Sequence, residues 1–123
     1  MNVEVMLEKI ENTDKTDNDG FKGDIIINNL STSKTCNILD GILPKFGTIN
    51  EIIHYRYRKS NNYRTIIKNN MYSIDIRGGL GSGYGGEGPH GFNYILKQVG
   101  IGEEEAKIVF NTQYDNAVIT FKK

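Results

Sequence analysis

The most unusual stretch of the chain is Gly78-Gly-Leu-Gly-Ser-Gly-Tyr-Gly-Gly-Glu-Gly-Pro-His-Gly91, in which eight of fourteen residues are glycine. An alternating segment, residues 71–77, precedes it, and an amphipathic segment, residues 92–99, follows it. This order predicts a strand, a glycine-rich loop and a helix. Because glycine reaches positive φ and leaves its amide unshielded, such a loop can wrap N–H groups around an anion, and a helix start adds further donors. The stretch therefore predicts phosphate or nucleotide binding.

The segments around this loop read mainly as strands. Residues 53–77 alternate between apolar and polar positions and are interrupted by Asn-rich turns, which predicts a three-stranded antiparallel meander. A capping-box pattern at residues 48–51 predicts a short helical turn before it. Further strands are predicted at residues 3–10, 21–30, 35–39, 107–112 and 118–122, with the first two and the last two paired as hairpins.

Together these elements predict an α+β fold, a single domain over residues 1–123 with a mainly antiparallel sheet and one or two short helices. A chain of 123 residues can bury a core without disulfides, and the lone Cys36 fits a reducing compartment. The N-terminus lacks a signal-peptide pattern, and no apolar run approaches the length of a membrane span. We therefore expect a cytoplasmic protein without membrane contact, in the host cytoplasm if the chain is viral.

The formal net charge is zero, but the charges are distributed unevenly. Residues 1–24 hold seven acidic and three basic side chains, whereas residues 54–77 hold six basic side chains and one acidic. A net charge of zero argues against binding of long nucleic acid, because domains that bind it usually carry a net positive charge. A local basic face suits a small anionic ligand better.

The glycine-rich stretch matches no specific phosphate-binding motif. The pattern G-x-G-x-x-G occurs twice, at residues 81–86 and 83–88, but glycine at this density produces such matches by chance, and the fingerprint also requires a βαβ unit. The Walker pattern fails because no Lys-Ser or Lys-Thr follows the glycines. An EF-hand in the acidic segment 11–20 fails on ligand spacing. What remains is a generic anion-receiving loop, or a flexible spacer.

The candidate ligand contacts are the basic side chains of the meander and the polar atoms of the loop. Guanidinium groups pair with phosphate, tyrosine stacks on bases, and a histidine beside the loop can donate to phosphate. No nucleophile, base and orienting group can be assembled, and two distant histidines and one cysteine are too few for a zinc site. We assign no catalytic residue, metal or cofactor. The predicted ligand-binding residues are Arg56, Arg58, Arg64, Arg77, Gly81, Ser82, Gly83, Tyr84, Gly85, Gly86 and His90.

The small size, Arg56-Tyr-Arg58 and Ile76-Arg-Gly-Gly-Leu-Gly-Ser-Gly-Tyr-Gly-Gly86 resemble the small phage anti-defence sponges, in particular the first Thoeris anti-defence protein type. The resemblance implies a homo-oligomer that sequesters cyclic ADP-ribose isomers or cyclic oligonucleotides without cutting them. It implies a viral inhibitor of host immune signalling, and it transfers no individual site residue.

Two other functions remain open at this point. An immunity or antitoxin-like module would cover a protein partner with the acidic N-terminal segment or the basic sheet. A small phosphoesterase would use His90 as its base. We expect the first of the three, a binding protein for a small nucleotide signal.

Overall fold

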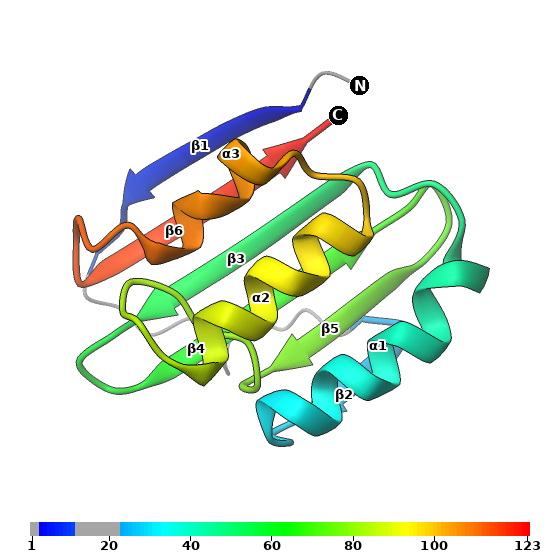
Figure 1. Ribbon diagram of the computed structural model, residues 1–123, viewed down its shortest axis with the longest axis horizontal. Coiled ribbons are helices and arrows are strands. Elements are labelled where there is room, and N and C mark those ends of the chain that lie inside the picture. Colours follow the sequence, from blue (N-terminus) through cyan, green and yellow to red (C-terminus); the bar gives the residue numbers. More distant parts are fainter. Residues whose placement is uncertain (1–2, 12–22) are drawn as a thin grey trace.

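A six-stranded sheet forms the centre of the computed structural model, which describes residues 3–11 and 23–123 (Figure 1). The strands lie in the order β1-β6-β3-β4-β5-β2, and neighbours run antiparallel except for the parallel pair β2 and β5. The strands are β1 (Glu4–Lys9), β2 (Ile25–Asn28), β3 (Glu51–Tyr57), β4 (Asn62–Lys68), β5 (Ser73–Arg77) and β6 (Asn116–Lys122).

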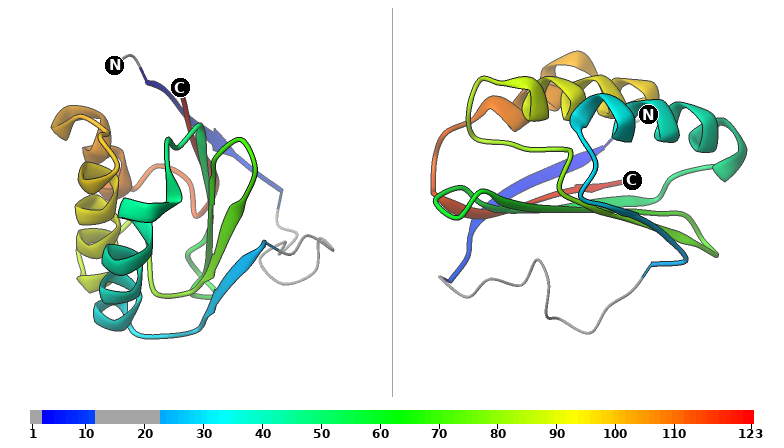
Figure 2. Two further views of the ribbon diagram at one scale, coloured as in Figure 1. Left: turned by 90° about the vertical axis from the view of Figure 1, so that its right-hand side faces the viewer. Right: turned by 90° about the horizontal axis from the view of Figure 1, so that it is seen from below.

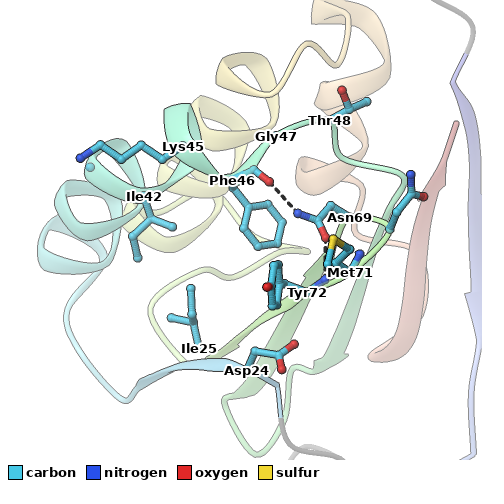
Figure 3. Close-up of a pocket in the computed structure, with 12 residues that line it drawn as sticks. Asp24, Ile25, Ile42, Lys45, Phe46, Gly47, Thr48, Asn69, Met71 and Tyr72 are labelled. Carbon is cyan, nitrogen blue, oxygen red and sulfur yellow. Dashed lines mark hydrogen bonds between the residues drawn. The ribbon is translucent and has the colours of Figure 1, made fainter.

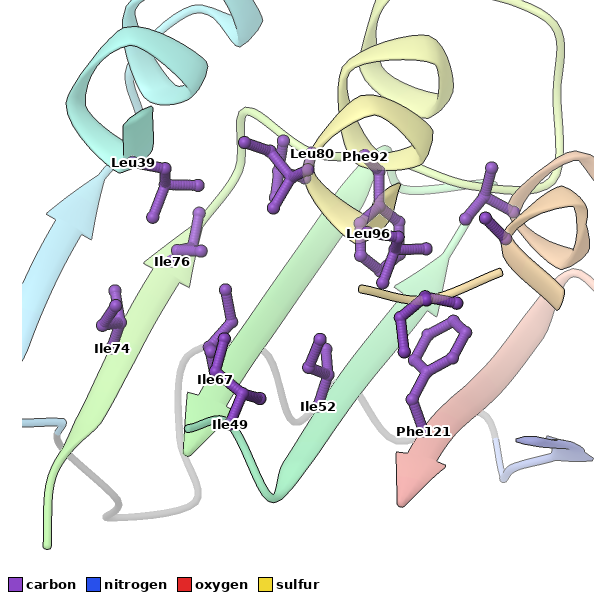
Figure 4. Packing of buried hydrophobic residues seen from close by; sticks show 14 of the residues in the cluster. Leu39, Ile49, Ile52, Ile67, Ile74, Ile76, Leu80, Phe92, Leu96 and Phe121 are labelled. Atoms are coloured by element: carbon purple, nitrogen blue, oxygen red, sulfur yellow. The ribbon is translucent and has the colours of Figure 1, made fainter. Parts of the chain in front are cut away.

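The helices of the described chain lie on one face of this sheet (Figure 2). They are α1 (Thr32–Phe46), α2 (Glu87–Gln98) and α3 (Glu103–Ala106), which runs into the 3₁₀ helix η1 (Lys107–Phe110). None of these described helices is long and apolar enough to cross a membrane. The core fills the space between helices and sheet (Figure 4), with buried side chains that include Leu39, Ile52, Ile67, Ile74, Ile76, Leu80, Phe92, Leu96 and Phe121. The predicted α+β fold with a mostly antiparallel sheet is confirmed.

Helix α1 occupies a segment for which the sequence predicts a strand at residues 35–39, and that prediction is wrong. Ser31 caps the helix, because its side chain accepts a hydrogen bond from the Lys34 amide. Thr35, Leu39 and Phe46 then fall on one helical face and are buried. Gly47 ends the helix with φ of 89°, a conformation that glycine adopts without strain. Burial of this face outweighs the low helix propensity of the threonine, glycine and proline residues in the segment.

Helix α2 confirms the helix predicted after the glycine-rich loop, and it begins inside that loop. Its cap is Gly86, and Glu87 in the first turn complements the positive end of the helix dipole. A Cβ at Gly91 would lie only 2.3 Å from Thr32 Cγ2. Glycine at this position therefore lets α1 and α2 approach closely over the sheet.

Burial against the helices also decides which strands pair. The meander β3–β4–β5 is confirmed. The predicted N-terminal hairpin is wrong, because β1 pairs with β6 and β2 pairs with β5 at the opposite edge. In this arrangement Val5 and Leu7 of β1 and Ile25 and Ile27 of β2 pack against the core. The predicted C-terminal hairpin is also wrong, since residues 107–110 form η1 and bury Val109. The chain forms no helical turn at residues 48–50, and most of the acidic segment 11–20 lies outside the described residues.

Candidate functional site: the glycine-loop cavity

The carboxyl ends of the parallel strands β2 and β5 lie beside the beginnings of the helices α1 and α2 (Figure 1). A cavity of about 310 Å³ is lined by residues from these ends. In open sheets, ligands commonly bind beyond the carboxyl ends of parallel strands, where helix N-termini supply free amides. We call this site the glycine-loop cavity. Its lining residues are Asn29, Leu30, Ser31, Thr32, Asn61, Tyr63, Gly78, Gly79, Leu80, Gly81, Tyr84 and Gly88.

The first turn of α1 forms one wall. The amides of a helix's first turn have no partner within the helix. Ser31 Oγ accepts a hydrogen bond from the Lys34 amide. Among the described residues, the amides of Thr32 and Ser33 therefore remain available as donors at the positive end of the helix dipole. The Thr32 hydroxyl donates to the Gly79 carbonyl at 2.6 Å and so ties this wall to the glycine segment.

Gly78 and Gly79 form the second wall, and both adopt positive φ, 72° and 75°. A Cβ at Gly79 would lie 2.4 Å from Thr35 Oγ1, so any other residue at this position would have to displace Thr35. The Thr35 hydroxyl is fully buried and has no hydrogen-bond partner in the described part of the chain. The amides of Gly78 and Leu80 donate to backbone carbonyls, whereas no described residue accepts from those of Gly79 and Gly81. The segment therefore presents free amides in a fixed conformation.

Two tyrosines form the aromatic side of the cavity. The rings of Tyr63 and Tyr84 lie 6.0 Å apart between centroids, at an angle of 43°. A Cβ at Gly81, Gly86 or Gly88 would lie 2.7, 2.8 or 2.6 Å from Tyr84 atoms, so these glycines form the slot that holds its ring. Burial raises the pKa of Tyr63 to about 12 and also raises the pKa of Tyr84. Both hydroxyls therefore stay protonated at neutral pH and can donate to a ligand.

A buried hydrogen-bond network fixes the loop to the sheet beneath the cavity. His54 on β3 contacts Thr65 Oγ1 through Nδ1 at 2.8 Å and Ser82 Oγ through Nε2 at 2.9 Å, and its ring packs on Phe92. Burial, together with the positive charge of Arg56, lowers the pKa of His54 to about 3. The imidazole is therefore neutral, and its role is to hold Ser82 in place.

The structure places two of the predicted ligand arginines under the loop, as structural anchors. Arg56 is fully buried, and its guanidinium donates to the carbonyls of Asn111, Gln113 and Tyr114. Arg58 binds the Asp115 carboxylate at 2.6 Å and the Gly83 carbonyl at 2.6 Å. Neither arginine lines the cavity. Through these hydrogen bonds Arg56 and Arg58 connect the glycine-rich loop and β3 to the segment that precedes β6.

The other two arginines pair with Asp75 on the sheet face opposite the helices. Arg64 Nε lies 2.9 Å from Asp75 Oδ1, and neither side chain is exposed. Arg77 Nη2 lies 3.3 Å from Asp75 Oδ2. Burial raises the pKa of Asp75, but the hydrogen bond and charge of Arg64 outweigh it and hold that pKa below its usual value. Alternation along the strands points these groups away from the cavity.

The predicted loop residues divide between the cavity and its surroundings. Gly81 and Tyr84 line the cavity, while Ser82 and Gly83 are buried beneath it. Gly85 is exposed, and a Cβ there would meet nothing within 4 Å. Gly86 caps α2, and His90 is exposed on that helix with its ring against Phe110. His90 therefore does not line the cavity.

Five polar lining residues were not predicted from sequence: Asn29, Ser31, Thr32, Asn61 and Tyr63. Two signals were present. Ser31 is a helix cap, which would have revealed α1, and Asn29 and Asn61 tolerate the left-handed conformation, with φ of 56° and 55°. The approach of β2 to β5, which brings these residues together, carries no local sequence signal.

Comparisons of the chain with protein-family models, curated proteins and solved structures found no match. Among the described residues, no three histidine, cysteine or acidic side chains gather as a group that could hold a metal ion. The glycine-loop cavity thus has a neutral lining of fixed amides, hydroxyl groups and two aromatic rings.

Proposed function

We propose that the protein binds a small nucleotide-type ligand in the glycine-loop cavity and releases it unchanged, as a sequestering protein does. The observation that carries this proposal is the convergence of three features: the start of α1, the positive-φ pair Gly78–Gly79, and the rings of Tyr63 and Tyr84. Amides at a helix start receive phosphate, and tyrosine rings stack on bases.

The lining also favours a particular charge on the ligand. Its described residues include no lysine, arginine, histidine, aspartate or glutamate. A terminal triphosphate such as that of ATP concentrates several negative charges that would lose water here without a counter-charge, whereas each phosphate of a cyclic oligonucleotide or of a cyclic ADP-ribose isomer carries one. Cyclic oligonucleotides and cyclic ADP-ribose isomers, the signals that a viral inhibitor of host immunity would capture, are the class we propose.

Binding without cleavage follows from the same lining. Hydroxyl, amide and phenol groups with raised pKa values hold ligands well but do not exchange protons readily at neutral pH. His54 and Ser82 form a close pair but are fully buried and engaged with each other. The cavity therefore supports a binding protein better than a phosphoesterase.

Calorimetric titration with cyclic AMP, cyclic di-AMP and ATP tests this proposal, followed by chromatography of the recovered nucleotide. We expect a phosphodiester to bind, ATP to bind more weakly, and the recovered ligand to be intact. Tyr84→Leu should weaken binding by about fivefold or more, since stacking contributes ~1–3 kcal/mol per base. Tyr94→Leu is the matched control, because Tyr94 is exposed on α2 outside the cavity. A cleaved nucleotide, or no binding of any phosphodiester, would overturn the proposal.

A further inference from the structure

A second and larger cavity lies at the opposite end of α1, between the last turns of this helix, β2 and the turn that joins β4 to β5 (Figure 3). Its volume is about 780 Å³, within the usual range of small-molecule sites. We call it the α1-end pocket. Its lining residues are Asp24, Ile25, Gly41, Ile42, Lys45, Phe46, Gly47, Thr48, Asn69, Asn70, Met71 and Tyr72.

The walls of this pocket are mostly apolar. Ile25 and Ile42 face Phe46 and Tyr72 across it, and the Met71 thioether lies beside them (Figure 3). Met71 is 76% exposed and Tyr72 52%, which is high for large apolar side chains. Aromatic rings pack favourably on tyrosine, phenylalanine and methionine sulfur. A ligand with a flat aromatic ring would cover what the protein leaves exposed.

At the rim of the pocket, the Asn69 side chain is hydrogen-bonded to the backbone, and the two charged side chains have opposite signs. Asn69 Nδ2 donates to the Phe46 carbonyl at 2.6 Å, and Asn69 Oδ1 accepts from the amides of Met71 and Tyr72. This side chain therefore fixes both exposed residues against the end of α1. The rim carries one acid, Asp24, and one base, Lys45. The pocket thus has no net charge to attract an ion.

Gly41 keeps the pocket open. It lies within α1 and lines the pocket one turn before Lys45, and a Cβ there would meet nothing within 4 Å. Glycine is a poor residue for a helix interior. The backbone conformation does not require it, because its φ is not positive. The empty space beside this glycine is the space that a ligand would fill.

We propose that the α1-end pocket is a binding site for an uncharged aromatic molecule, independent of the glycine-loop cavity. The two sites lie at opposite ends of a helix of fifteen residues, which at 1.5 Å per residue is ~22 Å long. One mononucleotide does not span both. The ligand class is a neutral heteroaromatic or phenolic ring, held by contact with the apolar walls.

The test is an NMR titration of ¹⁵N-labelled protein with indole as the probe. We expect saturable shifts of the Gly41, Gly47 and Tyr72 amides, with tryptamine and indole-3-acetate, which are charged, binding more weakly. Gly41→Leu places a side chain in the pocket and should weaken indole binding by about tenfold or more. Its melting temperature should equal or exceed that of the original protein, because leucine is the better helix former.

Gly85→Leu is the matched control, since it also adds a leucine in open space but on the glycine-rich loop. Indole should bind this variant as it binds the unchanged protein. Absence of saturable shifts in the unchanged protein would overturn the proposal. Equal indole binding by Gly41→Leu and Gly85→Leu, or preference for either charged analogue, would also overturn it.

Discussion

The two ends of α1 carry two cavities that use glycine in opposite ways. At the first end, Gly79 sits where a Cβ would lie 2.4 Å from Thr35 Oγ1, and its φ is 75°. At the other end, Gly41 has ordinary helical backbone and empty space beside it. Glycine is thus needed by the fold at Gly79 and serves only to leave room at Gly41. The number of glycines in a segment does not show which role each glycine has. The contact that a Cβ would make at that position shows it.

The largest expected change in the free energy of unfolding comes from a substitution at Gly79. Gly79→Ala combines a positive-φ strain of ~1–2 kcal/mol with displacement of Thr35, an overpacking cost of ~1–3 kcal/mol. Together these predict that the free energy of unfolding falls by about 2–5 kcal/mol. Urea unfolding of the variant measures it. An unchanged midpoint would show that the segment is a flexible spacer.

The buried His54 predicts a pH-dependent stability of intermediate size. Its pKa is about 3 in the fold and near the ordinary 6.5 in the unfolded chain. Between these values only the unfolded chain binds the proton, so the stabilisation is complete above pH 6.5 and falls as the pH decreases toward 3. The expected loss is about 1.4 kcal/mol per pH unit.

Urea unfolding at about pH 7, 6 and 5 checks this, with His54→Gln as the comparison. The glutamine does not titrate, so its stability should depend less steeply on pH over this range. Equal slopes for the two proteins would show that the pKa of His54 is the same in the folded and the unfolded chain, and that burial does not hold the ring neutral at acid pH.

The smallest expected effect is at Gly41. Gly41→Ala adds a methyl group in open space and improves helix propensity, so the free energy of unfolding should rise by about 0.5–1 kcal/mol. A glycine-to-alanine substitution is thus expected to lower the free energy of unfolding in the cavity at the start of α1 and to raise it in the pocket at the end of α1. A destabilised Gly41→Ala protein would remove the contrast, and with it the interpretation that this glycine only leaves space.

The sequence predicted local structure well where alternation or spacing was clear. The meander of β3, β4 and β5 and the helix after the loop followed from period-two and helical patterns, and both are observed. Helix α1 was missed because Thr35 and Ile38 are good strand formers, while the decisive burial of Leu39 and Phe46 depends on the sheet beneath them. Strand pairing at the two edges was also missed, because it is set by the core and not by neighbours in sequence.

Of the residues predicted to bind a ligand, only two line the glycine-loop cavity. The glycine-rich loop does border a cavity, and Gly81 and Tyr84 line it. The arginines were chosen for their charge, yet Arg56 and Arg64 are buried with carbonyl or carboxylate partners. Sequence shows that a charge is present but not whether a protein group neutralises it. The wall from α1 required the three-dimensional contact between β2 and β5.

NMR titration with cyclic AMP shows whether free amides at the start of α1 and in the glycine segment receive a phosphodiester. We expect the largest shifts at the amides of Thr32, Ser33, Gly79 and Gly81, which lie together at the glycine-loop cavity or its edge. Amides at the far end of α1, such as Gly47, should not move. Shifts concentrated at the Arg64, Asp75 and Arg77 face of the sheet, or no saturable shift at the four cavity amides, would contradict this expectation.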